Sequence, residues 1–108
     1  MPNDPKLVER MRAALKAHPG ITEKKMFGGY CWMLNGNMLC GVEVGRFMFR
    51  VGKDLEAEAL ARPGAKPMDI TGRPMRGIIW VQEEYVRGQD MLDWIAFASR
   101  FVGALPPK

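Results

Sequence analysis

The Asn35-Gly36 pair, with apolar residues on both sides, is the feature that most constrains the fold of this chain. Asn-Gly suits a turn in which both central residues have a positive φ, and it is typical of two-residue β-hairpins. We therefore predict two antiparallel strands, residues 30–34 and 37–44, with Leu34 opposite Asn37. In the same register Cys31 lies directly opposite Cys40.

Cys31 and Cys40 are the only two cysteines, and their predicted pairing admits three interpretations: a disulfide or redox switch, a metal or catalytic site, or two packed thiols. A directly opposed, non-hydrogen-bonded pair has Cα atoms about 4.5 Å apart, at the short end of the range that a disulfide accepts. The N-terminal residues are charged and lack the uninterrupted apolar region of a secretory signal. No apolar run reaches the roughly 18 to 20 residues that span a bilayer. We therefore expect a cytoplasmic protein without a membrane segment, in which both thiols are reduced and packed.

The hydrophobic pattern around the hairpin predicts three helices and several further strands. Helices are expected from Pro5 to the stop at His18-Pro19-Gly20, from Asp54 to Arg62, and over the apolar positions between Met91 and Leu105. Strands are expected at 24–27, 30–34, 37–44, 46–51, 65–70 and 76–82. The chain is thus predicted to be one domain, residues 1–108, with an α+β fold. In its two layers, an antiparallel sheet of about five to six strands packs with N-terminal, short middle and C-terminal helices.

The second hairpin, between 37–44 and 46–51, is predicted to place Cys40 opposite Phe49. This register collects apolar side chains on one face, whereas a slip by one residue would put Arg46 and Arg50 there instead. Strict alternation carries this assignment back to the first hairpin. The predicted core face then holds Cys31, Met33, Met38 and Cys40.

The other face of the sheet is expected to be the more exposed one. An apolar, aromatic outer face beside arginines is typical of a partner-binding or dimerisation surface. The alternative is that a loop or the second helix covers it. The candidate partner surface consists of Tyr30, Trp32, Leu34, Leu39, Arg46, Met48 and Arg50.

The formal net charge of +4 is unevenly spread along the chain. Residues 1–53 carry nine Lys/Arg against four Asp/Glu, whereas residues 54–108 carry seven against eight. A basic half is typical of a nucleic-acid footprint, and an ordinary solvated surface is the alternative. The candidate contacts to an anion or to nucleic acid are Lys24, Lys25, Arg73 and Arg76.

Residue types that usually carry catalysis are sparse. The single histidine, His18, lies at the predicted end of the first helix, and no serine or threonine sits in a nucleophile motif. Two cysteines and one distant histidine lack the spacing of a zinc site. We therefore expect a protein that is not an enzyme and holds no cofactor and no metal.

Three motifs mark the sequence beyond its secondary structure. They are Met26-Phe27-Gly28-Gly29, Gly72-Arg73-Pro74-Met75, and the helix around Trp94 that leads into Leu105-Pro106-Pro107-Lys108. With these motifs the chain, from about Lys24 to Lys108, resembles the N-terminal domain of the TfoX/Sxy family. The resemblance implies an antiparallel sheet packed on helices, akin to the arrangement of secretion chaperones, and it supplies no active-site residues.

The resemblance also implies a class of function. Full-length members of that family regulate natural competence in bacteria, together with the cAMP receptor protein at promoters, and they are not enzymes. They carry a second, C-terminal TfoX domain, which we expect this chain to lack.

Three hypotheses for function follow. The first is a regulatory domain that works through protein contacts. Its partner would be the transcription machinery, and a second copy of the chain could also bind to form a homodimer. The second is direct nucleic-acid binding through the basic N-terminal half. The third, a thiol-based redox sensor, rests on Cys31 and Cys40 alone.

Overall fold

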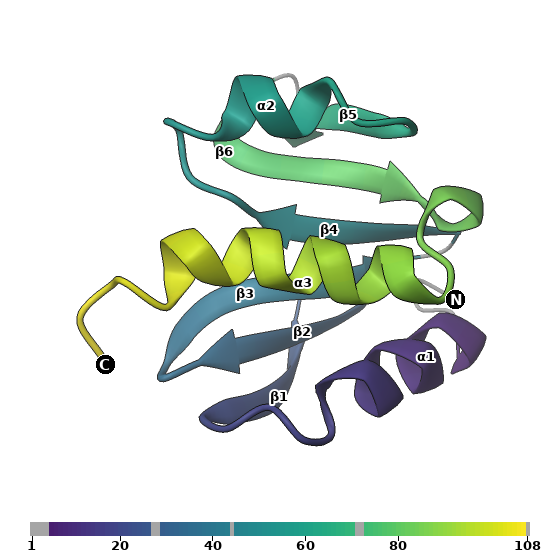
Figure 1. Ribbon diagram of the computed structural model, residues 1–108, viewed down its shortest axis with the longest axis vertical. Helices are drawn as coiled ribbons and strands as arrows, with labels where there is room; N and C mark the ends of the chain where they lie inside the picture. The colour runs from purple at the N-terminus through teal and green to yellow at the C-terminus, as the bar shows by residue number, and fades with distance from the viewer. Residues whose placement is uncertain (1–4, 27–28, 44, 71–72, 108) are drawn as a thin grey trace.

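The computed structural model describes residues 5–26, 29–43, 45–70 and 73–107. Six strands form one antiparallel sheet in the order β1-β2-β3-β4-β6-β5. The predicted α+β fold, with N-terminal, short middle and C-terminal helices, is confirmed (Figure 1). In chain order the elements are α1 (Pro5–Leu15), β1 (Ile21–Met26), β2 (Gly29–Leu34), β3 (Asn37–Glu43), β4 (Arg46–Arg50), α2 (Glu56–Leu60), β5 (Ala65–Ile70), β6 (Arg73–Gln82), the 3-10 helix η1 (Glu83–Tyr85) and α3 (Gln89–Val102).

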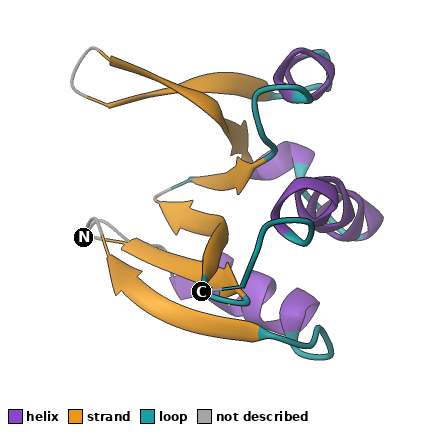
Figure 2. Cartoon of the chain, turned by 90° about the vertical axis from the view of Figure 1, so that its left-hand side faces the viewer, coloured by secondary structure: helices purple, strands orange, loops and turns teal. Residues whose placement is uncertain are grey.

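The helices α1, α2 and α3 all lie on the same side of the sheet, so none of the described helices covers the opposite face (Figure 2). The apolar stripe of α3 is buried against β3 and β4, where the Trp94 ring stacks on Phe49 with the ring centroids 5.3 Å apart. The helix ends at Val102, so the predicted continuation to Leu105 is wrong. The side chains that α1 buries are Leu7, Val8, Met11 and Leu15.

The first hairpin contains a β-bulge that the sequence did not reveal. Asn35 and Gly36 have φ angles of 53° and 87°, as the predicted turn requires. Leu34 pairs with Asn37 as expected, but the register then shifts and Trp32 pairs with Cys40. Leu39 is therefore an extra residue in β3 with no partner of its own in β2.

The bulge separates the two cysteines. Cys31 pairs with Gly41, so the prediction that it lies opposite Cys40 is wrong. Cys40 belongs to the core between sheet and helices, whereas Cys31 belongs to a second apolar cluster that includes Met48. The two thiols thus lie on opposite faces of the sheet, and both are free and buried.

The bulge also inverts the predicted faces of β2 and of the start of β3, whereas Cys40 lies in the core as predicted. Leu39 and Cys40 are consecutive, yet both side chains are 0% exposed in the helix-side core. Because side chains alternate along a strand, this one extra residue turns the rest of the hairpin over. Of the residues predicted to face the core, Cys31 and Met38 lie in the second cluster, and of those predicted to face outward, Trp32 and Leu34 lie in the core.

The second hairpin has the predicted register. Cys40 pairs with Phe49, and Glu43 pairs with Arg46. Gly45 has a φ of 76°, while Val44 lies outside the described residues. The apolar pairing rule was therefore sufficient for this hairpin, in which no residue is inserted.

A tight crossing of glycines joins the end of β4 to β6. The Gly77 carbonyl accepts hydrogen bonds from the backbone N–H groups of Val51 and Gly52, at 2.8 and 3.0 Å. Gly52 and Gly77 both have a φ of 84°, which favours glycine. A Cβ atom on Gly77 would lie 3.0 Å from the Gly52 carbonyl carbon and 3.1 Å from the Lys53 nitrogen. The crossing therefore requires glycine at residue 77.

The carboxylate of Glu56 completes this crossing from α2. It accepts the Gly77 N–H at 2.9 Å and the Arg76 Nε–H at 2.7 Å, although the Glu56 residue is only 8% exposed. The backbone hydrogen bond from Gly77, followed by the bond from Arg76, lowers the pKa of Glu56. The negative charge of Glu56 is therefore part of the folded state.

We expect Glu56→Gln to lower the free energy of unfolding at pH 7 by about 1.5 to 3 kcal/mol, the range for hydrogen bonds to charged groups. Because the folded state lowers the pKa of Glu56, its contribution is present above the ordinary carboxyl pKa and is lost as pH falls through the folded-state pKa. Urea unfolding between pH 7 and pH 3 should therefore show a smaller acid-induced loss for Glu56→Gln than for the unsubstituted chain. Glu58→Gln, at an exposed position of the same helix, should leave both quantities unchanged, and equal effects of the two variants would contradict this role.

We also expect the native thiols to resist alkylation. Burial raises the pKa of both Cys31 and Cys40, so little thiolate is present to react. In alkylation followed by mass spectrometry, both should react far more slowly in native than in urea-unfolded protein, with Cys40 the slower. Cys31→Ser and Cys40→Ser assign the two rates, and an intramolecular disulfide in native protein would contradict the placement of the thiols on opposite faces.

Candidate functional site

Several residues of the predicted partner surface are buried and cannot contact a partner. Trp32 is 2% exposed and Leu39 0% exposed, and both pack under the helices with Leu34. Tyr30 packs against the same core. The prediction that these four residues form an outer face is wrong, because the bulge at Leu39 turns them inward.

An apolar face does exist on the open side of the sheet, but other residues form it. One row of paired residues crosses all six strands there. Lysines stand at the two ends of the row, and apolar or small residues occupy its centre. The row consists of Lys24, Cys31, Gly41, Met48, Trp80 and Lys66.

At the centre of this row, Gly41 has no side chain, and neighbouring side chains fill the space above it. A Cβ atom at Gly41 would lie 2.9 Å from Met48 Cε and 3.2 Å from Cys31 Sγ. The ends of these two side chains therefore lie over Gly41, which explains why Cys31 and Met48 are buried on a face that none of the described helices covers. Met38 and Trp80 pack against the same cluster and remain partly exposed.

Trp80 is held in place by an arginine on the neighbouring strand. The Arg46 guanidinium lies 3.9 Å from the centroid of the Trp80 ring, a cation–π contact. Arg46 also donates hydrogen bonds to Glu43 Oε1 at 3.0 and 2.6 Å. Arg46 and Met48 thus remain on the open side as predicted, whereas the Arg50 guanidinium lies 5.5 Å from the centroid of the Phe101 ring of α3.

We refer to the open side formed by Met38, Met48, Trp80, Lys24 and Lys66 as the open face. An exposed lysine lies at each end of this face, Lys24 on the outermost strand β1 and Lys66 on the outermost strand β5. The charge of Arg46 is offset by Glu43. A partly exposed tryptophan and methionine therefore lie between two lysines.

The four predicted anion contacts do not form one site. Lys24 pairs with Cys31 and Lys25 with Tyr30, so the two adjacent lysines extend to opposite sides of β1. Arg76 is bound by Glu56. Arg73 begins β6, and its side chain lies outside the described part of the structure.

Arg76 lies near basic residues other than the predicted Lys24, Lys25 and Arg73. Together with Arg50 and Lys53 it lines a pocket of about 260 Å³ beside the Gly52–Gly77 crossing. Asp54 lines the same pocket, and Glu56 already binds Arg76. Acidic groups therefore offset much of the positive charge at this pocket.

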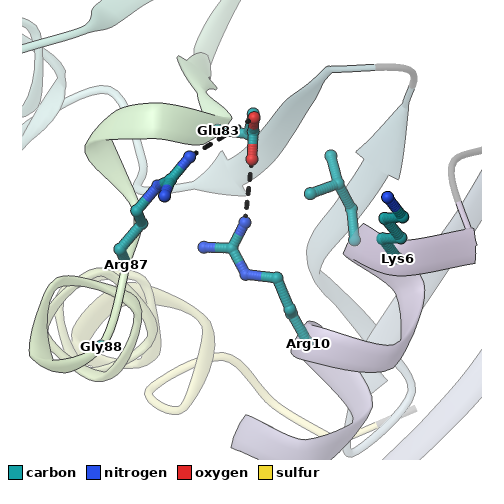
Figure 3. Close-up of a pocket in the computed structure, with 6 residues that line it drawn as sticks. Lys6, Arg10, Glu83, Arg87 and Gly88 are labelled. Atoms are coloured by element: carbon teal, nitrogen blue, oxygen red, sulfur yellow. Dashed lines mark hydrogen bonds and ion pairs between the residues drawn. The ribbon is translucent and has the colours of Figure 1, made fainter.

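A second basic pocket, of about 550 Å³, lies between α1 and the start of α3 (Figure 3). The sequence pattern did not identify it, because its charged residues come from distant parts of the chain. Only the polar side of α1, which carries Lys6 and Arg10, was a signal for it. Its lining residues are Lys6, Leu7, Arg10, Glu83, Arg87 and Gly88.

His18 has a local role in the structure. Its Nδ1 lies 3.0 Å from the carbonyl oxygen of Pro19. Within the described residues, no three His, Cys, Asp or Glu side chains come together in a way that could hold a metal ion. None of the described helices is both long enough and apolar enough to cross a membrane.

Comparison with known proteins identifies the family of this chain. No curated protein and no solved structure matches it significantly. The family model for the TfoX N-terminal domain matches residues 13–101, which is most of the chain and includes every strand of the sheet. The chain belongs to the TfoX N-terminal domain family.

Proposed function

We propose that this protein is a non-enzymatic regulatory domain that binds a protein partner through the open face of its sheet. Membership of the TfoX N-terminal domain family indicates a regulatory, competence-related role. The open face supports a role in partner binding, because it combines apolar contact area with positive charge on one accessible side of the molecule.

Trp80 is the observation that carries this proposal. It is partly exposed on the open face, between Met48 and Lys66, whereas Trp32 and Trp94 are buried in the core. Tryptophan is enriched at the energetically important positions of interfaces. The contact of its ring with Arg46 presets its orientation, which lowers the entropic cost of binding.

The chemistry of the open face defines the partner it suits. Met38 and Trp80 are the partly exposed apolar side chains of this face, and the flexible, polarizable side chain of methionine adapts to irregular apolar surfaces. Lys24 and Lys66 add positive charge on either side of them. The partner is therefore a protein segment that presents apolar side chains flanked by acidic groups, such as a subunit of the transcription machinery.

The properties of the two thiols do not favour the redox-sensor hypothesis. Sensor cysteines are accessible and have a lowered pKa. Burial instead raises the pKa of both Cys31 and Cys40. We therefore place regulation in surface contacts rather than in thiol chemistry.

Direct nucleic-acid binding is the second candidate function. An arginine stacked on a partly exposed aromatic ring also suits single-stranded nucleic acid, and Arg46, Trp80 and Lys24 lie on the same face. We rank it second because Glu43 offsets the charge of Arg46 and the two lysines stand at opposite edges of the sheet.

We expect substitutions on the open face to weaken partner capture strongly. Trp80→Ala, and separately the charge reversal Lys24→Glu with Lys66→Glu, should each reduce the recovery of specific partners from native bacterial lysate by about tenfold or more, as for interface anchor residues. Quantitative mass spectrometry of affinity-captured proteins measures this loss. Trp80→Ala removes a packed ring, whereas the lysine variant tests the same face at exposed positions.

Two control variants separate the open face from general surface effects. Lys25→Glu changes the adjacent lysine on the other side of β1, and Leu92→Ala removes the exposed leucine of α3. Both should leave capture unchanged. If the control and open-face variants lose the same proteins to the same extent, the open face is not the partner site.

Fluorescence anisotropy with labelled single- and double-stranded DNA separates the two candidate functions. For a protein-binding domain we expect no specific affinity even at low salt. Affinity that falls steeply with rising salt and is lost in Lys24→Glu would instead support nucleic-acid binding.

A further inference from the structure

The basic pocket of Figure 3 is built from two separate parts of the chain, α1 and the segment from η1 to the start of α3. Lys6 and Arg10 come from α1, Glu83 from η1, and Arg87 from the connection that leads into α3. Figure 3 shows Glu83 between Arg10 and Arg87, with Lys6 beyond Arg10. Among the residues that the structure describes, the lining thus holds three cationic side chains and one carboxylate.

Arg10 is fixed in this pocket by contacts from several sides. It donates one hydrogen bond to Glu83 Oε2 at 3.0 Å and another to the Val86 carbonyl oxygen. Its guanidinium also lies 5.3 Å from the centroid of the Phe47 ring. These contacts hold the group in one orientation, and a guanidinium has five N–H donors, so further donors remain for a ligand.

Arg87 is held much less firmly. Its Nη2 lies 3.8 Å from Glu83 Oε1, and its side chain is 66% exposed. A long, exposed ion pair of this kind contributes little to stability. Arg87 can therefore turn from Glu83 to a ligand at little cost, while Arg10 keeps its contact with the other oxygen of the same carboxylate.

The start of α3 adds to the positive potential of the pocket. Gly88 precedes the first residue of this 14-residue helix and lines the pocket, and no side-chain hydrogen bond caps the helix there. The N-terminal end of a helix carries partial positive charge. Arg10 and Arg87 converge on Glu83, and this helix end, with Asp90 in its first turn, lines the same pocket. The surplus of positive groups favours a compact anion with two negative charges.

The size of the pocket indicates that the ligand is more than a bare anion. At about 550 Å³ it falls within the range of pockets that hold small organic molecules. From this convergence of positive charge in a pocket of this size, we propose that it binds the phosphate group of a small phosphorylated molecule. The proposal concerns a different part of the molecule from the open face and does not depend on it.

The test is a titration of the intact chain followed by two-dimensional amide NMR at constant ionic strength. The probes are inorganic phosphate, glucose 6-phosphate and a phosphoserine peptide. We expect saturable shifts at Lys6, Arg10 and Gly88, with glucose 6-phosphate the tightest of the three. Tighter binding of the phosphoserine peptide would overturn the assignment to a small molecule.

Two substitutions change the pocket in opposite directions. Arg87→Ala should weaken glucose 6-phosphate binding about tenfold, the change expected for losing one hydrogen bond to a charged group. Glu83→Gln should strengthen it several-fold, because it removes the negative charge of Glu83 from the lining while an amide oxygen can still accept from Arg10. Arg100→Ala, at an exposed arginine outside the pocket, is the matched control and should have no effect.

A merely structural ion-pair cluster would give a different result. In that case Glu83→Gln would not strengthen binding, and any shifts would be equally large in Arg87→Ala and in Arg100→Ala. Either result, or the lack of saturable shifts with all three probes in a folded sample, overturns the proposal. The dispersion of the amide spectrum shows whether each variant is folded.

Discussion

The unpaired residue Leu39 is the constraint on which the organisation of the sheet depends. It lets two consecutive side chains, Leu39 and Cys40, enter the same core. It therefore decides that Trp32 meets the helices and that Cys31 does not. With strict alternation, the face of the first hairpin that binds α1 and α3 would be the one that is now open.

The remainder of the fold positions the two candidate sites independently. The open face depends on Gly41, over which Met48 and Cys31 close, and on the ring contact between Arg46 and Trp80. The basic pocket depends instead on Arg10, whose hydrogen bonds connect α1 to the segment between β6 and α3. Because no residue belongs to both sites, each can be altered without direct damage to the other.

The sequence predicted those features that depend on local patterns. The turn at Asn35-Gly36, the register of the second hairpin and the fold class follow from turn chemistry and apolar periodicity. The bulge had no signal, because Leu39 is apolar and fits either face. β6 begins at Arg73 rather than at the expected Arg76. The pairing of β6 with β4 ends at Ile78, so the residues before Ile78 have β5 as their strand neighbour on one side only, and proline is tolerated at such a position. The basic pocket between α1 and α3 was not predicted, because Arg10 and Glu83 are 73 residues apart in the sequence.

The strand order has a consequence for self-association. β1 and β5 are the outermost strands, and each leaves one row of backbone groups unpaired within the described sheet. β1 carries the consecutive charged residues Glu23, Lys24 and Lys25, and β5 contains Pro67, which has no N–H to donate. Both features discourage the addition of a strand from another chain, which would otherwise extend the sheet into a fibre. Two copies of this domain would therefore associate through their faces rather than through a continuous intermolecular sheet.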